Sequence, residues 1–176
     1  MAATDGMFRE ARAADAPAIA ALLTECWQDA YAGLLPAALL RHRLPALHRE
    51  AWAAHFGAPR PGIVLLAEGS DGLRGFCAAW LEGDEAYVDN LHLRPGLRGG
   101  GVGRGLLGRA VAALAARGAT RAALTIIDGN EGALRFYQRL GGVAGAPYPD
   151  LLHGEAVTYR RIAWADAAVL VAACAA

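Results

Sequence analysis

The chain has 176 residues, of which 17 are arginine, none is lysine and 17 are acidic, so its formal net charge at pH 7 is zero. This length suits one domain with a sizeable core, and the charge balance argues against a polyanionic partner such as nucleic acid. Three widely spaced cysteines, no signal-like N-terminus and no apolar stretch long enough to cross a bilayer predict a cytoplasmic protein without a membrane partner.

The first third of the chain is predicted to be mostly helical. Asp15 is placed to cap a helix with Pro17 in its first turn, and apolar residues recur on one helical stripe as far as Tyr31. A second helical region follows from Ala37 to Phe56, before a loop rich in glycine and proline.

Six segments carry the patterns of strands, one before this helical region and five after it. They are Met7–Arg12, Ile63–Glu68, Leu73–Leu81, Glu85–Leu93, Arg121–Ile127 and Ala156–Trp164. A helix from about Gly103 to Gly118 separates the fourth strand from the fifth, and the crossover rule predicts that these two strands are parallel neighbours. A shorter helix runs from Asn130 to Leu140.

The whole chain, 1–176, is therefore expected to form one α/β domain with a mixed sheet and its core at 7–164. Residues 165–176 form an apolar tail. This tail is a candidate to cover a sheet edge or to close a homodimer interface.

The most informative stretch runs from Leu91 to Leu107. A strand that breaks at Pro95, passes through a glycine-dense turn and enters a helix presents free backbone N–H groups at a positive helix end, which suits a phosphate. The missing Gly-Lys-Ser/Thr excludes a P-loop, and the position past mid-chain argues against a dinucleotide fold. A glycine-rich connector without a ligand is the other interpretation.

Within this stretch, Arg98-Gly-Gly-Gly-Val-Gly103 resembles the acyl-CoA pyrophosphate loop, Arg/Gln-x-x-Gly-x-Gly/Ala, of the GNAT (GCN5-related N-acetyltransferase) superfamily. Asn130 to Gly141 resembles its closing segment, Asn-x-x-Ala-x-x-x-Tyr-x-x-x-Gly, at the expected distance. Trp27 to Pro36 looks like the first-helix segment of bacterial members that act on small amines. One departure is Gly142, where members commonly have a phenylalanine beneath the last helix.

The resemblance implies a mostly antiparallel sheet of six to seven strands, flanked by about four helices and splayed at the acyl-CoA site. It also implies acetyl-CoA as co-substrate and no metal. Backbone groups of the splayed strand would bond the pantetheine amides, the loop amides would hold the pyrophosphate, and Arg98 or Arg104 would add charge-assisted bonds. The implied cofactor-binding residues are Leu91, His92, Leu93, Arg98, Gly99, Gly100, Gly101, Val102, Gly103, Arg104 and Asn130.

In the superfamily the amine usually attacks the thioester directly, and a tyrosine protonates the leaving thiolate. By position this catalytic residue is Tyr137, for which a half-buried structural aromatic is the other interpretation. No nucleophile is convincing, because Cys77 falls in a strand pattern without an assigned histidine partner.

The base is expected on the strand Glu85–Leu93. Alternation places Tyr87, Asp89, Leu91 and Leu93 on one face and Asn90 and His92 on the other. Asp89 is then the best base or ammonium-binding residue, whereas a bulge would shift the register by one and favour Asn90. The ordinary pKa of His92 suits a base, but its predicted face argues against it.

Trp27 and Tyr31 are expected to wall the acceptor pocket together with Asn90, and core packing is the alternative for both aromatic residues. The remaining histidines, His42, His48, His55 and His153, lack metal-ligand spacing. The leading hypothesis is an acetyl-CoA-dependent N-acetyltransferase for a small-molecule or peptide amine. The alternatives are a catalytically silent acyl-CoA sensor, which would not need Tyr137, and an acyltransferase with another acyl group or acceptor.

Overall fold

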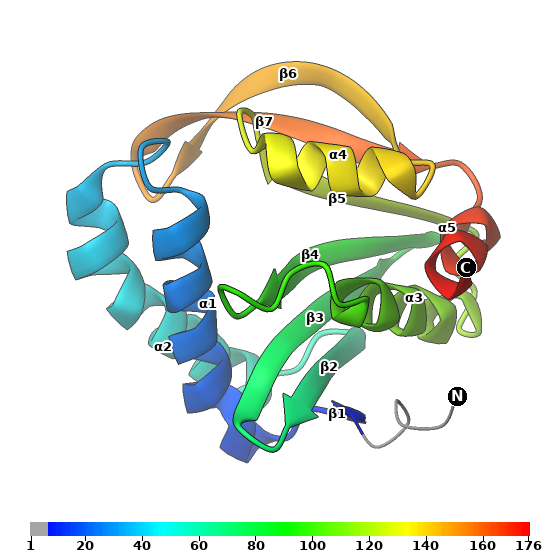
Figure 1. Ribbon diagram of the computed structural model, residues 1–176, viewed down its shortest axis with the longest axis horizontal. Coiled ribbons are helices and arrows are strands. Elements are labelled where there is room, and N and C mark those ends of the chain that lie inside the picture. The colour runs from blue at the N-terminus through cyan, green and yellow to red at the C-terminus, as the bar shows by residue number, and fades with distance from the viewer. Residues whose placement is uncertain (1–6) are drawn as a thin grey trace.

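The computed structural model describes residues 7–176, which form a seven-stranded sheet flanked by helices (Figure 1). The strands are Phe8–Glu10 (β1), Gly62–Gly69 (β2), Gly72–Glu82 (β3), Glu85–Leu93 (β4), Arg121–Ile127 (β5), Val143–Leu152 (β6) and Glu155–Trp164 (β7). The helices are Ala16–Ala30 (α1), Leu44–Gly57 (α2), Val102–Ala115 (α3), Glu131–Arg139 (α4) and Ala167–Ala175 (α5), with short turns of helix at Ala13–Asp15 (η2) and Leu39–Arg43 (η3).

The strand order is β1-β2-β3-β4-β5-β7-β6, and of these neighbours only β4 and β5 run parallel. The prediction of a mixed, mostly antiparallel α/β sheet is confirmed. Alternate residues of β2 and β3 point to opposite faces: Leu66 and Phe76 pack beneath α1 and α2, whereas Leu65 and Cys77 belong to the core beneath α3, α4 and α5.

The sheet opens between its two parallel strands. Pairing of β4 with β5 runs only from Glu85 opposite Arg121 to Val88 opposite Leu124, although both strands continue beyond these residues. Figure 1 shows β4 and β5 separating toward α1. The splay that the family resemblance implied is therefore present.

A β-bulge at Asp89 reverses the predicted faces of β4. Ala79 of β3 lies opposite Val88 and Ala78 lies opposite Asn90, so Asp89 has no partner. Beyond the bulge, Leu91 and Leu93 join Val88 on the α3 face. The predicted regular alternation, which put Asp89 on the same face as Leu91 and Leu93, is wrong because one extra residue is inserted at Asp89, and the alternative register with a bulge is the one present. Tyr87, Asn90 and His92 consequently share the α1 face.

Two elements near the C-terminus were not predicted. Strand β6 is exposed along most of its length and forms one edge of the sheet, and its Pro147 and Pro149 break the usual strand pattern. The apolar tail folds as α5, whose first turn is capped by the Asp166 carboxylate accepting from Ala168 N–H at 2.8 Å. Helix α5 packs on α3 and buries Leu170 completely.

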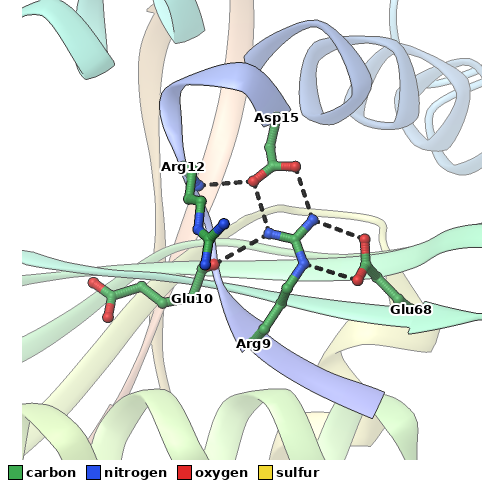
Figure 2. A network of polar contacts seen from close by, with 5 residues as sticks. All are labelled: Arg9, Glu10, Arg12, Asp15 and Glu68. Carbon is green, nitrogen blue, oxygen red and sulfur yellow. Dashed lines mark hydrogen bonds and ion pairs between the residues drawn. The ribbon is translucent and has the colours of Figure 1, made fainter. Parts of the chain in front are cut away.

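Arg9 of β1 joins the start of α1 to the end of β2 (Figure 2). Its guanidinium donates four hydrogen bonds of 2.8 Å, two to the carboxylate of Asp15 and two to that of Glu68. Asp15 also accepts from Arg12 N–H at 2.7 Å. Asp15 does precede α1, but its side chain makes no bond to the helix amides because Arg9 and Arg12 engage it, so the predicted capping bond is wrong.

Asp15→Asn is expected to lower the free energy of unfolding at pH 7 by about 1 kcal/mol. The effect is this small because solvent partly screens the ion pair with Arg9. The Arg9 hydrogen bonds lower the pKa of Asp15 from 3.8 to about 2. A depressed folded-state pKa stabilises the protein above the unfolded pKa, so the difference between wild type and variant should shrink as the pH falls from about 4 toward about 2.

Urea denaturation at a series of pH values measures this difference. Glu10→Gln is the matched control, because Figure 2 shows that carboxylate pointing away from Arg9. A pH-independent difference between wild type and Asp15→Asn would contradict the ion-pair account.

Gly142 has no side chain to pack beneath α4, where the resemblance led us to expect a phenylalanine. Trp164 packs there instead. Its indole Nε1 donates to Leu140 O at 2.8 Å, and its ring stands edge-on to Tyr137. A Cβ placed on Gly142 would lie 2.7 Å from both the Trp164 ring and Ile162. The close approach of Trp164 and Ile162 thus requires a glycine at position 142.

Gly142→Ala should therefore destabilise the fold by about 1–3 kcal/mol through overpacking. Gly145→Ala, three residues later in β6, is the control, because its added Cβ would meet Arg161 O at an ordinary 3.5 Å. Thermal denaturation of both variants provides the comparison. A Gly142→Ala protein as stable as wild type would mean that Trp164 packs elsewhere.

Candidate active site

A cleft of about 1800 Å³ runs through the opening between β4 and β5. Residues of the glycine turn and of α3 and α4 line one end of it. Side chains of α1, α2 and the β6–β7 hairpin line the other end, among them Trp27, His48 and Tyr159. Because helices from both faces of the sheet contribute, the cleft is a passage between the two faces.

The glycine turn is open backbone. Gly96, Gly99 and Gly101 have φ values of +87°, +93° and +80°, and an added Cβ on any of them would meet nothing within 4 Å. Other residues rarely adopt this conformation, so glycine sets the turn. The first bond of α3 runs from Gly105 N–H to Gly101 O at 2.9 Å, so the N–H groups at residues 102–104 precede it and have no intrahelical acceptor. Such a helix end binds anions favourably.

Two ion pairs dock this turn onto α1. Arg98 donates to Asp29 Oδ2 at 2.7 Å, and Arg94 Nε lies 3.9 Å from Glu25 Oε2 one helical turn earlier. Within residues 7–176 no carboxylate pairs with Arg104, which lines the cleft at the start of α3. Arg104 is therefore a guanidinium available to a ligand beside the glycine turn, whereas Arg98 is already engaged.

Tyr137 lies at the floor of the cleft with 7% of its surface exposed. Its ring packs against Phe136 and Trp164. Burial raises the pKa of its phenol, with Cys77 and Tyr31 adding to the shift, so the hydroxyl keeps its proton at neutral pH.

Asn130 also lines the cleft, at the start of α4. Its Oδ1 accepts from Ala133 N–H at 3.1 Å. Tyr31 is buried, and desolvation raises the pKa of its phenol. The Asn130 side chain thus caps α4 before any ligand binds.

The polar residues of β4 lie at different depths. Asp89 is exposed at the bulge and accepts from Asn90 Nδ2 at 3.0 Å. His92 lies further in, its ring 5.6 Å from that of Phe76. Burial lowers the pKa of His92 to about 3, with smaller contributions from His48 and Arg98, so its imidazole is neutral at pH 7.

The structure brings most of the predicted site residues to this one cleft. Those that line it are Trp27, Tyr31, Asp89, Asn90, Leu91, His92, Leu93, Arg98, Gly99, Gly101, Gly103, Arg104, Asn130 and Tyr137. Gly100 and Val102 do not line it: Gly100 is exposed, and the Val102 side chain packs on the core.

The buried cysteines are structural. Burial raises the pKa of Cys77, and it raises the pKa of Cys26 to about 12. Cys26 Sγ donates to Leu93 O at 3.1 Å, which fastens α1 to the end of β4. Neither thiol ionises near pH 7, in agreement with the absence of a convincing nucleophile in the sequence.

Several lining residues were not predicted as part of a site. Tyr148, Asp150 and His153 belong to the overlooked strand β6 and its turn. His48 was considered only for metal-ligand spacing, although it lies between Leu44 and Trp52 on the buried stripe of α2. Its place on the inward-facing stripe of a helix was the sequence feature that could have indicated His48 as a site residue.

The β6–β7 turn is anchored over the end of the cleft that holds His48. His153 and Gly154 have φ values of +51° and +88°, as a two-residue hairpin turn of type I′ requires. Arg43 of η3 donates to His153 O at 2.6 Å and to Glu155 Oε1 at 3.1 Å. The turn is thereby held close to α2.

Within residues 7–176, no helix is both long enough and apolar enough to cross a membrane. The same part of the chain gathers no group of at least three His, Cys, Asp or Glu side chains that could hold a metal ion.

The sheet opened between parallel strands, with a glycine turn leading into α3 beside the gap, defines the N-acetyltransferase fold. Residues 17–142 match the model of the Acetyltransferase (GNAT) family, and the chain belongs to that family. The prediction made from the two motifs is confirmed.

Solved structures share the fold at low sequence identity. The PaiA N-acetyltransferase of Thermoplasma acidophilum, in complex with coenzyme A, has a TM-score of 0.71 at 18% identity, over 86% of this chain and 96% of that one. YncA of Salmonella typhimurium, with its cofactor acetyl-CoA, has a TM-score of 0.63 at 21% identity, over 89% and 91% of the two chains.

A curated relative matches part of the sequence. A mycothiol acetyltransferase of Kineococcus radiotolerans is 40% identical over 85 residues, which is 46% of this chain and 26% of that protein. The chain therefore spans about a quarter of the length of this relative.

Proposed function

We propose that the protein transfers the acetyl group of acetyl-CoA to a primary amine by direct attack of the amine on the thioester. One observation carries this proposal: a single cleft joins the free amides of α3 to the buried, protonated phenol of Tyr137. The solved structures of similar fold that hold coenzyme A and acetyl-CoA support the choice of cofactor.

The cofactor is held mainly by backbone. Amides between Gly99 and Arg104 bind the pyrophosphate, and the Arg104 guanidinium adds charge-assisted bonds. The backbone of Leu91 to Leu93, which lies beyond the last pair with β5, bonds the pantetheine amides as a further strand would. Asn130 joins this binding from the start of α4.

Tyr137 is the general acid. When the amine nitrogen bonds to the thioester carbon and the C–S bond breaks, the departing thiolate takes the phenol proton. The proton that the nitrogen loses returns through water to the phenolate, which restores Tyr137. Direct attack is the expected route because the buried thiols of Cys26 and Cys77 stay protonated.

The acceptor enters from the side of α1 and α2. The aromatic residues Trp27 and Tyr31 wall this end, and their rings stand edge-on at 4.9 Å. Asp89 at the rim supplies negative charge for an incoming ammonium group, and Asn90 a hydrogen-bonding amide. The acceptor is thus a small-molecule or peptide amine, acetylated in the cytoplasm.

Thiol release from acetyl-CoA, monitored across a panel of primary amines and short peptides, tests this function. We expect amine-dependent release and an N-acetylated product by mass spectrometry. Binding of coenzyme A without turnover of any amine would favour a silent sensor. Faster turnover of a longer acyl-CoA would favour another acyltransferase.

A further inference from the structure

We propose that His48 binds the nitrogen of the acceptor amine, through a hydrogen bond from the amine N–H to His48 Nε2. This inference rests on the proposed N-acetyltransferase function, for which it names the group that orients the nucleophile.

The tautomer of His48 follows from a count of protons. Thr24 Oγ1 lies 2.9 Å from Ala20 O and 2.9 Å from His48 Nδ1. A carbonyl only accepts, so the arrangement that makes both contacts hydrogen bonds places the single hydroxyl proton of Thr24 on Ala20 O. In that arrangement His48 Nδ1 donates to Thr24, and the lone pair of the neutral imidazole is on Nε2.

This lone pair belongs to a residue of the cleft wall. His48 is 7% exposed and lines the cleft, with its ring edge-on to Trp27 at 5.6 Å. Within residues 7–176 the side-chain bond of His48 uses Nδ1 alone. An acceptor at Nε2 is therefore available to a molecule that enters the cleft.

The surroundings keep this imidazole neutral. The titratable groups that face it are His92 of β4 and His153 of the β6–β7 turn. Burial lowers the pKa of His48 to about 4, and His153 adds to the shift. At neutral pH His48 thus carries no positive charge to repel an amine, and its lone pair stays available.

An amine needs such an acceptor. Attack on the thioester carbon uses the nitrogen lone pair, so a hydrogen bond from one N–H fixes the direction in which that lone pair points. Trp27 Nε1 is buried and unbonded, but an indole N–H is a donor and cannot serve an amine N–H in this way. His48 and Asp89 also differ in role. The Asp89 carboxylate at the rim attracts the charged ammonium form of the acceptor, whereas the neutral His48 binds the uncharged amine.

Three substitutions separate this role from packing. His48→Gln can place an amide oxygen near the position of Nε2, whereas His48→Asn keeps a donor for Thr24 but has no atom at that position. His48→Leu keeps apolar volume alone. With the most active amine of the panel, we expect kcat/KM to fall about 10- to 100-fold in His48→Asn and His48→Leu, mainly through the KM for the amine, and to fall little in His48→Gln.

Two further readouts make the test decisive. The affinity for coenzyme A, measured by calorimetry, should be equal in all variants, and ¹⁵N NMR of the free wild-type protein should show the His48 proton on Nδ1. An unchanged kcat/KM in His48→Asn, or a proton on Nε2, would overturn the inference while leaving the proposed function intact. A wild-type protein that binds coenzyme A but acetylates no amine would overturn both.

Discussion

Gly101→Val is expected to lower the affinity for coenzyme A by about 100-fold, because several charge-assisted bonds to the pyrophosphate are lost together. Gly101 has a φ of +80°, a conformation that a β-branched residue avoids, and it directly precedes the free amides of α3. A valine would both strain the turn and redirect these amides. Isothermal titration calorimetry with coenzyme A measures the loss.

The far end of the same helix supplies the control. Gly118 has a φ of +107°, and an added Cβ there also meets nothing within 4 Å. Gly118→Val should strain the chain in the same way without changing affinity for coenzyme A, and circular dichroism checks that both variants fold. Wild-type affinity in Gly101→Val would refute the assignment of the loop, as would wild-type affinity in a double variant that adds Arg98→Glu.

Tyr137→Phe is expected to reduce kcat about 100-fold and to leave the KM for acetyl-CoA nearly unchanged. The substitution removes only the hydroxyl, so the ring contacts with Phe136 and Trp164 persist and the fold should keep its stability. Because burial raises the pKa of Tyr137, ionisation of this phenol should cause no loss of activity up to its ordinary value near pH 10.

Steady-state kinetics across pH 6–10 test both parts of this prediction. Tyr159→Phe is the control. Tyr159 also lines the cleft, but it belongs to β7 and lies near the acceptor end of the cleft. Full turnover in Tyr137→Phe would mean that another group, or water, protonates the thiolate.

The parts of the fold that the sequence predicted well are those with strong local signals. Strand β5 was predicted with its observed ends. Helices α3 and α4 are each followed within three residues by a glycine of positive φ, Gly118 and Gly141. The glycine turn and the closing segment were sufficient to recognise the family, because each motif is a short contiguous stretch of sequence. These predictions needed no knowledge of contacts between distant residues.

The predictions that failed depended on long-range contacts. The bulge at Asp89, which from the sequence was only the alternative, arises from pairing with β3 and reversed the side-chain faces of half a strand. The partner of Arg98, Asp29, lies 69 residues earlier, so nothing local indicated that this guanidinium was engaged. His48 became a candidate only when the structure placed it beside Thr24 and on the cleft.

The cofactor end of the cleft was thus easier to predict than the acceptor end. Backbone amides and glycines hold the cofactor, and their arrangement follows from a short motif. The acceptor end is assembled from α1, α2 and the β6–β7 hairpin, which are far apart in sequence. Its residues are therefore visible only once the fold is known.

The prolines of β6 limit how molecules of this protein can associate. A neighbour that approached this margin of the sheet would find no amide hydrogen at Pro147 or Pro149, and the opposite margin, β1, offers only the three residues Phe8–Glu10. Neither border is suited to recruiting a strand from a second copy. Pairing of two copies through these borders is consequently disfavoured, and with it the growth of the sheet into aggregates.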